Sequence, residues 1–96
     1  MFKILLSDTA SSQLNSLRSD QTYAARVKAI DKTLGFLANP RHPGLQTHEF
    51  TSLHGPKGEK IFEAYAQQNT PAAYRIFWYY GPNRQQITVI SITAHP

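Results

Sequence analysis

The chain has 96 residues, of which 41% are hydrophobic and 17% charged, and ten Lys and Arg against six Asp and Glu give a formal net charge of +4. This length accommodates one domain, residues 1–96, and the composition argues against general disorder. The absence of cysteine excludes disulfides and thiolate metal sites, and no apolar run approaches the about 20 residues of a membrane span.

We therefore expect a cytoplasmic protein without membrane contact, since the short apolar start is also too brief for a signal peptide. The positive charge suits a polyanionic partner such as RNA, DNA or an acidic protein segment. A small basic protein that binds no nucleic acid is the alternative that the charge leaves open.

The N-terminal part of the chain predicts a short strand followed by two helices. Residues 2–7 (FKILLS) are apolar and end at a polar group, which is typical of a strand. Residues 9–19 predict a helix capped by Asp8 and Thr9, whose oxygens can accept free backbone N–H groups. Residues 21–38 predict a longer amphipathic helix, because apolar side chains recur there at spacings of three and four: Tyr23, Val27, Ile30, Leu34 and Leu37.

After a connector at residues 39–45, the apolar period changes to two, which predicts four strands, at about 46–53, 60–67, 73–80 and 86–94. Strands joined by short turns form an antiparallel meander, and two amphipathic helices can cover one of its faces. The predicted fold is α+β with the order β-α-α-β-β-β-β. In it, the N-terminal strand and two helices pack on one face of a small antiparallel sheet.

Alternation along the last two strands predicts a face with polar side chains. In residues 73–80, Arg75, Phe77 and Tyr79 point the same way. In the last strand, strict alternation places one set of side chains on a common face: Ile87, Val89, Ser91, Thr93 and His95. A turn near residue 83 would bring Ser91 and Thr93 to the face of Arg75.

Side chains on such a face can catalyse RNA cleavage in which the 2′-hydroxyl group of the RNA attacks the adjacent phosphate. The reaction needs a base for the hydroxyl proton, a cation near the phosphate and an acid for the leaving oxygen. Arg75 can hold a phosphate with two N–H groups, His95 can act as acid or base, and Glu63 can act as a base or orienting group. These residues are the catalytic candidates. Each also has a structural interpretation: Arg75 pairs with Glu63 or Glu59, Glu63 is a solvated strand residue, and His95 is simply a terminal residue.

The RNA-binding candidates are Lys57, Lys60 and Tyr79. The two lysines can steer phosphates, and an exposed tyrosine can stack on a base. In the alternative interpretation, Lys57 belongs to a Gly-Pro-Lys-Gly turn and Tyr79 packs in the interior. We expect no metal and no other cofactor, because the remaining histidines do not show a zinc-binding spacing: His42, His48 and His54.

Four segments together resemble the RelE/ParE toxin superfamily over nearly the whole chain: NPRHPGLQTHEFTSLHG, GEKIFEAYA, AYRIFWYYG and ITVISITAHP. The resemblance implies a small antiparallel sheet with two helices on one face. It implies a toxin of a type II toxin–antitoxin system, with a cognate antitoxin as partner. Members of one branch cut mRNA in the ribosome without a metal, whereas ParE-like members poison DNA gyrase.

Residue by residue, Arg75 falls on the arginine that contacts the scissile phosphate in ribosome-dependent members, and His95 falls on the C-terminal histidine of the YoeB-like branch. Glu63 and Lys60 fall on the strand that carries catalytic residues in various branches. Pro96 stands where several active ribonucleases have a tyrosine. The resemblance thus favours a ribosome-dependent mRNA endonuclease, binding the ribosome, mRNA and antitoxin, as a homodimer or a toxin–antitoxin hetero-oligomer. A gyrase inhibitor and a catalytically degenerate binding protein are the alternatives.

Overall fold

The computed structural model describes residues 1–67, 70 and 72–94. Its elements follow the predicted order β-α-α-β-β-β-β, with one short 3-10 helix, η1, added between the two α-helices. The bounds are β1 Lys3–Leu6, α1 Asp8–Arg18, η1 Gln21–Tyr23, α2 Ala24–Leu37, β2 Thr47–His54, β3 Lys60–Tyr65, β4 Tyr74–Tyr80 and β5 Gln86–Ala94.

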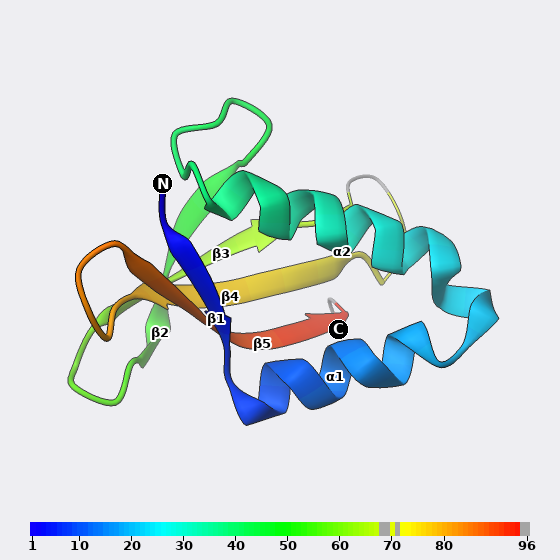
Figure 1. The fold of residues 1–96 in the computed structure, drawn as a ribbon, viewed down its shortest axis with the longest axis horizontal. Helices are drawn as coiled ribbons and strands as arrows, with labels where there is room; N and C mark the ends of the chain where they lie inside the picture. Colours follow the sequence, from blue (N-terminus) through cyan, green and yellow to red (C-terminus); the bar gives the residue numbers. More distant parts are fainter. Residues whose placement is uncertain (68–69, 71, 95–96) are drawn as a thin grey trace.

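The sheet has five strands in the order β1-β5-β4-β3-β2 (Figure 1). From β2 to β5, each strand pairs antiparallel with the next, as the short turns predict. β1 lies beside β5 and runs parallel to it, with Lys3 opposite Gln86. The sheet is therefore mixed rather than purely antiparallel, because the two helices between β1 and β2 return the chain to the far edge of the sheet.

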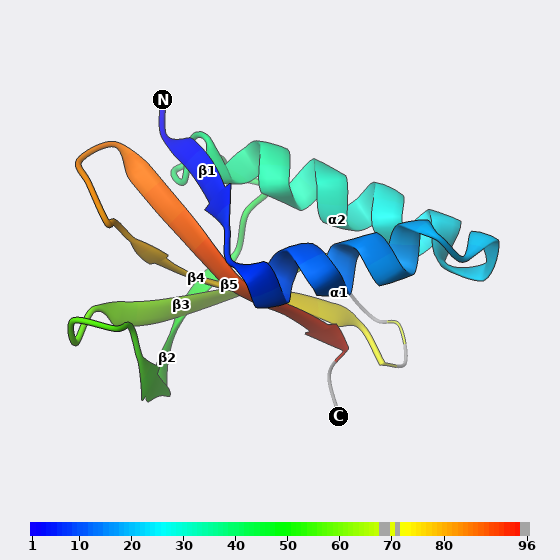
Figure 2. The same cartoon turned by 60° about the horizontal axis from the view of Figure 1, so that its bottom comes forward.

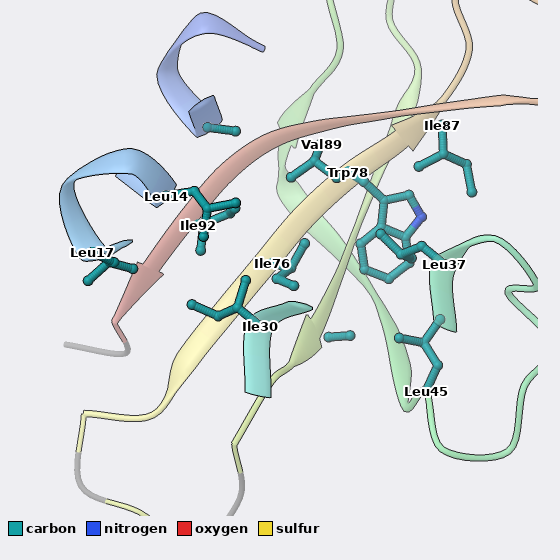
Figure 3. Packing of buried hydrophobic residues seen from close by; sticks show 12 residues of the cluster. Leu14, Leu17, Ile30, Leu37, Leu45, Ile76, Trp78, Ile87, Val89 and Ile92 are labelled. Atoms are coloured by element: carbon teal, nitrogen blue, oxygen red, sulfur yellow. The ribbon is translucent and has the colours of Figure 1, made fainter. Parts of the chain in front are cut away.

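Both α-helices lie on the same side of the sheet (Figure 2), which confirms the predicted layering. Between the helices and the sheet is an apolar core in which Trp78 is fully buried (Figure 3). The labelled side chains come from α1, α2, the connector after α2, β4 and β5: Leu14, Leu17, Ile30, Leu37, Leu45, Ile76, Trp78, Ile87, Val89 and Ile92. Burying such side chains supplies most of the free energy that favours folding.

The first helix begins at a different cap from the one predicted. The Ser7 hydroxyl accepts a hydrogen bond from the Ala10 N–H at 3.1 Å, and Ser7 has extended backbone angles. The prediction of a cap by Asp8 and Thr9 was wrong, because β1 ends at Leu6 and the helix starts directly after Ser7. Asp8 instead lies in the first turn, where a carboxylate interacts favourably with the helix dipole.

The N-cap of α1 and a side chain within the helix form hydrogen bonds with the backbone of β5 beyond Val89, the last β5 residue that pairs with β1. Beyond that point, the Ser7 hydroxyl donates to the Ile90 carbonyl at 3.1 Å. The Gln13 side-chain oxygen accepts from the Ile92 N–H at 2.6 Å. Helix α1 therefore covers the open edge of β5 and fixes its position against the core.

An exposed ion pair links the two α-helices. Arg18 donates to both carboxylate oxygens of Asp31, at 2.6 and 2.9 Å. These hydrogen bonds raise the pKa of Arg18 above its ordinary value. Since both side chains are almost half exposed, solvent screening limits the contribution of this pair to at most about 1 kcal/mol.

Candidate functional site

The sheet face opposite the helices carries a largely buried ion pair between neighbouring strands. Nη1 of Arg75 on β4 lies 3.2 Å from Oε2 of Glu63 on β3, and each side chain is 15% exposed. The guanidinium carbon is 4.8 Å from the centroid of the Phe77 ring, within cation–π range. The Arg75 Nε is buried without a hydrogen-bond partner. The predicted pairing of Arg75 with Glu63 is therefore confirmed.

The strand register explains this arrangement. Tyr65 lies opposite Arg75, and Glu63 lies opposite Phe77, so Glu63 and Arg75 are diagonal neighbours on one face. On the other side of β4, Thr93 of β5 lies opposite Arg75. The predicted grouping of Arg75 with Thr93 on one face is therefore confirmed. His95, the other catalytic candidate, lies outside the described residues.

The alternation of side chains between the two faces of the sheet shifts partway along β5. Ile87 and Val89 point into the helix-covered core, whereas Ile90 packs on the opposite face. The cause is a β-bulge: Phe77 pairs with Ser91, but the next residue, Trp78, pairs with Val89. The prediction that Ile87 and Val89 share the face of Ser91 was wrong for this reason. An inserted residue shifts the alternation and leaves no mark in the apolar pattern.

Tyr79 lies on the same sheet face as Arg75 but is only 7% exposed. It packs with Ile61 and Phe77 in a second, smaller apolar cluster, with Phe50 and Ile90 at its edge. The structure thus places this RNA-binding candidate in a packed environment, where little of its ring is available for stacking on a base.

The two lysine candidates lie apart from the Arg75–Glu63 pair. Lys57 is exposed in the turn between β2 and β3, where its backbone N–H donates to the Glu59 side chain at 2.7 Å. Lys60 is exposed at the start of β3, opposite His54. By strand alternation, Lys60 points toward the side of Phe62, which packs against the helix-covered core. The structure therefore does not bring Lys60 onto the face of Arg75.

One neighbour of the ion pair was considered from the sequence only as a zinc ligand. His48 of β2 lies directly opposite Glu63 of β3. Alternation alone places His48 and Phe50 on one face, but the pairing of His48 with Glu63 follows only from the register.

Among the described residues, no group of three or more His, Cys, Asp or Glu is placed to hold a metal. Within the same part of the chain, no helix has the length and apolar character required to cross a membrane.

Searches of protein families and of curated proteins gave no match to this sequence. Solved structures do match over almost the whole chain. A metal-bound toxin from Helicobacter pylori superposes with a TM-score of 0.68 at 17% identity, covering 99% of this chain and 96% of that one. The YoeB dimer from Staphylococcus aureus gives a TM-score of 0.65 at 15% identity, covering 99% of this chain and 98% of that one.

A YoeB/ParE toxin from Agrobacterium tumefaciens gives a TM-score of 0.62 at 13% identity, covering 99% of this chain and all of that one. The three matches span the full order of elements, including the β1 strand and both helices. At these identities, the likeness concerns the path of the backbone rather than individual side chains. The chain therefore has the RelE/ParE-type toxin fold.

Proposed function

We propose that this chain is the toxin of a type II toxin–antitoxin system and acts as a ribosome-dependent mRNA endonuclease that inhibits translation. The observation that carries the proposal is the Arg75 guanidinium, held on the face of the sheet that the helices leave open, with its Nε unpaired and Glu63 beside it. The toxin fold and the net charge of +4 add support. Its partners would be a cognate antitoxin, the ribosome and mRNA, and it would act in the cytoplasm.

In the proposed reaction, the 2′-oxygen of a nucleotide attacks the adjacent phosphorus while the bond from phosphorus to the 5′-oxygen breaks. Glu63 accepts the proton of the 2′-hydroxyl group. Arg75 stabilises the negative charge that develops on the phosphate oxygens. His95 donates a proton to the leaving 5′-oxygen. The products are a 2′,3′-cyclic phosphate and a free 5′-hydroxyl, and the resemblance to the RelE-like branch implies that no metal takes part.

A gyrase inhibitor is the second candidate, and the ion pair of Arg75 with Glu63 favours it. Because Glu63 engages the guanidinium, the ion pair can serve stability alone. An inhibitor that acts by binding needs no catalytic group, and the buried position of Tyr79 is compatible with that. A catalytically degenerate binding protein held by its antitoxin would share these features.

Two activity assays with the purified chain separate these candidates. We expect the chain to stop protein synthesis in a cell-free translation reaction and to leave DNA supercoiling by gyrase unchanged. The variant Arg75→Ala should inhibit translation about 100-fold less, the usual effect of removing one group that stabilises transition-state charge. Arg18→Ala, which removes an exposed arginine on α1, should keep full activity. Inhibited supercoiling with normal translation would instead identify a gyrase inhibitor. If neither assay shows an effect, the chain is a catalytically degenerate binding protein.

A further inference from the structure

We propose that His48 is a positioning residue of this site, which holds the Glu63 carboxylate when a phosphodiester occupies Arg75. The inference rests on the proposed function, because it concerns the binding of RNA at the same face. It assigns to His48 a role as a pH-dependent counter-ion, and it makes the affinity for the RNA backbone depend on the charge of this one imidazole.

The strand register places the three side chains in a row across β2, β3 and β4. His48 lies directly opposite Glu63, and Cβ atoms of such a pair are about 4.5–5.5 Å apart on the same face. Two residues along β2, the Phe50 ring packs edge-on against Phe77, with centroids 5.0 Å apart. This contact places Phe50 on the face of Arg75, and the pairing with Glu63 places His48 on the same face. Glu63 therefore lies between a histidine on one side and an arginine on the other.

Binding of a phosphodiester creates a charge conflict that a second cation resolves. In the free protein, Glu63 occupies Nη1 of Arg75, while the buried Nε has no partner. A phosphate on the guanidinium adds a second anion beside the Glu63 carboxylate, and like charges at this separation disfavour each other. If the carboxylate turns to His48, Arg75 becomes available to the phosphate, and Glu63 keeps an opposite charge at its side.

Histidine has the chemistry for this exchange. Its side chain gains a positive charge between pH 8 and 5, and His48 is exposed, so its ring is free to reorient. Among the described residues, the titratable and charged groups that face Glu63 are His48 from β2, Tyr65 from β3, and Arg75 and Tyr79 from β4. Tyrosine and arginine side chains ordinarily keep their charge state in this pH interval. The expected pH dependence therefore belongs to His48.

The test measures binding of a short 2′-O-methyl oligouridylate to the full chain by fluorescence anisotropy, between pH 8 and pH 5.5 at low salt. This probe cannot be cleaved through its 2′-position, and neither its phosphodiesters nor its bases titrate in this range. For the wild type, we expect affinity to rise by about fivefold as the pH falls, the size typical of a partly exposed charge pair. His48→Gln should flatten the profile at the weak level, and His48→Lys should hold the strong level at every pH.

Two further variants make the test specific. His54→Gln removes an exposed histidine of the same strand, opposite Lys60, and should keep the wild-type profile. In a Glu63→Gln background, adding His48→Gln should have no effect, because no carboxylate remains for the imidazole to hold. A pH dependence that survives in His48→Gln would overturn the inference, since a group other than His48 would then be responsible for it. The inference would also be overturned if His48→Gln changed the pH profile in the Glu63→Gln background as much as it does in the wild type. His48 would then contact the phosphate directly.

The result is separable from the fate of the proposed function. If wild type and variants all fail to bind the probe, the inference is wrong, whereas the proposed endonuclease is judged separately by mRNA cleavage during translation. If the profile depends on His48 as expected but no mRNA is cut during translation, only the endonuclease is wrong, and the face is a nucleic-acid-binding surface.

Discussion

Arg75 lies in a largely buried ion pair with Glu63, and the groups around this pair decide what the site can do. An arginine in the middle of an aromatic strand needs a partner, and Glu63 was one of the two carboxylates expected to provide it. The sequence does not predict which groups surround the pair. The neighbour on β2, His48, depends on the register between β2 and β3, which shifts between Glu49 and His54. Long-range register is set by packing and turns, and short apolar patterns do not encode it.

The low exposure of the Arg75–Glu63 pair predicts a measurable cost when one partner is removed. We expect Glu63→Ala to lower the free energy of unfolding by about 1–2 kcal/mol, because a mostly buried guanidinium is left without its carboxylate. Urea denaturation followed by Trp78 fluorescence measures this. The control is Asp31→Ala, which removes the partner of Arg18 from a pair almost half exposed, and should cost less. Equal losses in the two variants would contradict the account of a buried pair.

At the scale of elements, local patterns predict the type and order of every strand and α-helix. The amphipathic period of residues 21–38 matches α2, and the change of period after residue 45 matches the meander from β2 to β5. Two features escape the patterns. The bulge in β5 exchanges the faces of Ile87 and Val89, and the parallel pairing of β1 with β5 depends on how the whole chain folds back. Both arise from tertiary contacts rather than from neighbouring residues.

The cap of α1 gives a prediction at this scale. Ser7→Ala removes the hydroxyl that accepts from the Ala10 N–H and donates to the Ile90 carbonyl. We expect the free energy of unfolding to fall by about 1 kcal/mol or more, since the helix loses its cap and β5 loses a hydrogen bond. Ser12→Ala, at an exposed position within α1, is the matched control and should change stability little. A Ser7→Ala protein as stable as the control would show that the cap has no energetic role.

At the scale of the whole molecule, the helices cover one face of the sheet and leave the other to carry the candidate site. This division explains how a chain of 96 residues can keep a core around Trp78 and still present Arg75 on its second face. The sequence predicts the two-layer arrangement, because amphipathic helices must bury their apolar stripes against something. It does not predict that the face opposite the helices has its own small apolar cluster, in which Phe77 packs with Tyr79.

The net charge of +4 predicts that binding to RNA is largely electrostatic. We expect the affinity for a single-stranded RNA to fall several-fold between about 50 and 200 mM salt, because each phosphate contact releases counter-ions that salt restores. Arg75→Ala should reduce the slope of log affinity against log salt relative to Arg18→Ala. Affinity that stays constant over this range would argue against phosphate contacts as the basis of binding.

Mapping mRNA 5′ ends in a cell-free translation reaction tests directly whether the face bearing Arg75 cleaves mRNA. We expect new ends within codons when the wild-type chain or Arg18→Ala is added, only when ribosomes are present, and none with Arg75→Ala. Cuts of equal yield with Arg75→Ala would contradict the assignment of the site, and the absence of cuts with the wild type would contradict the endonuclease itself.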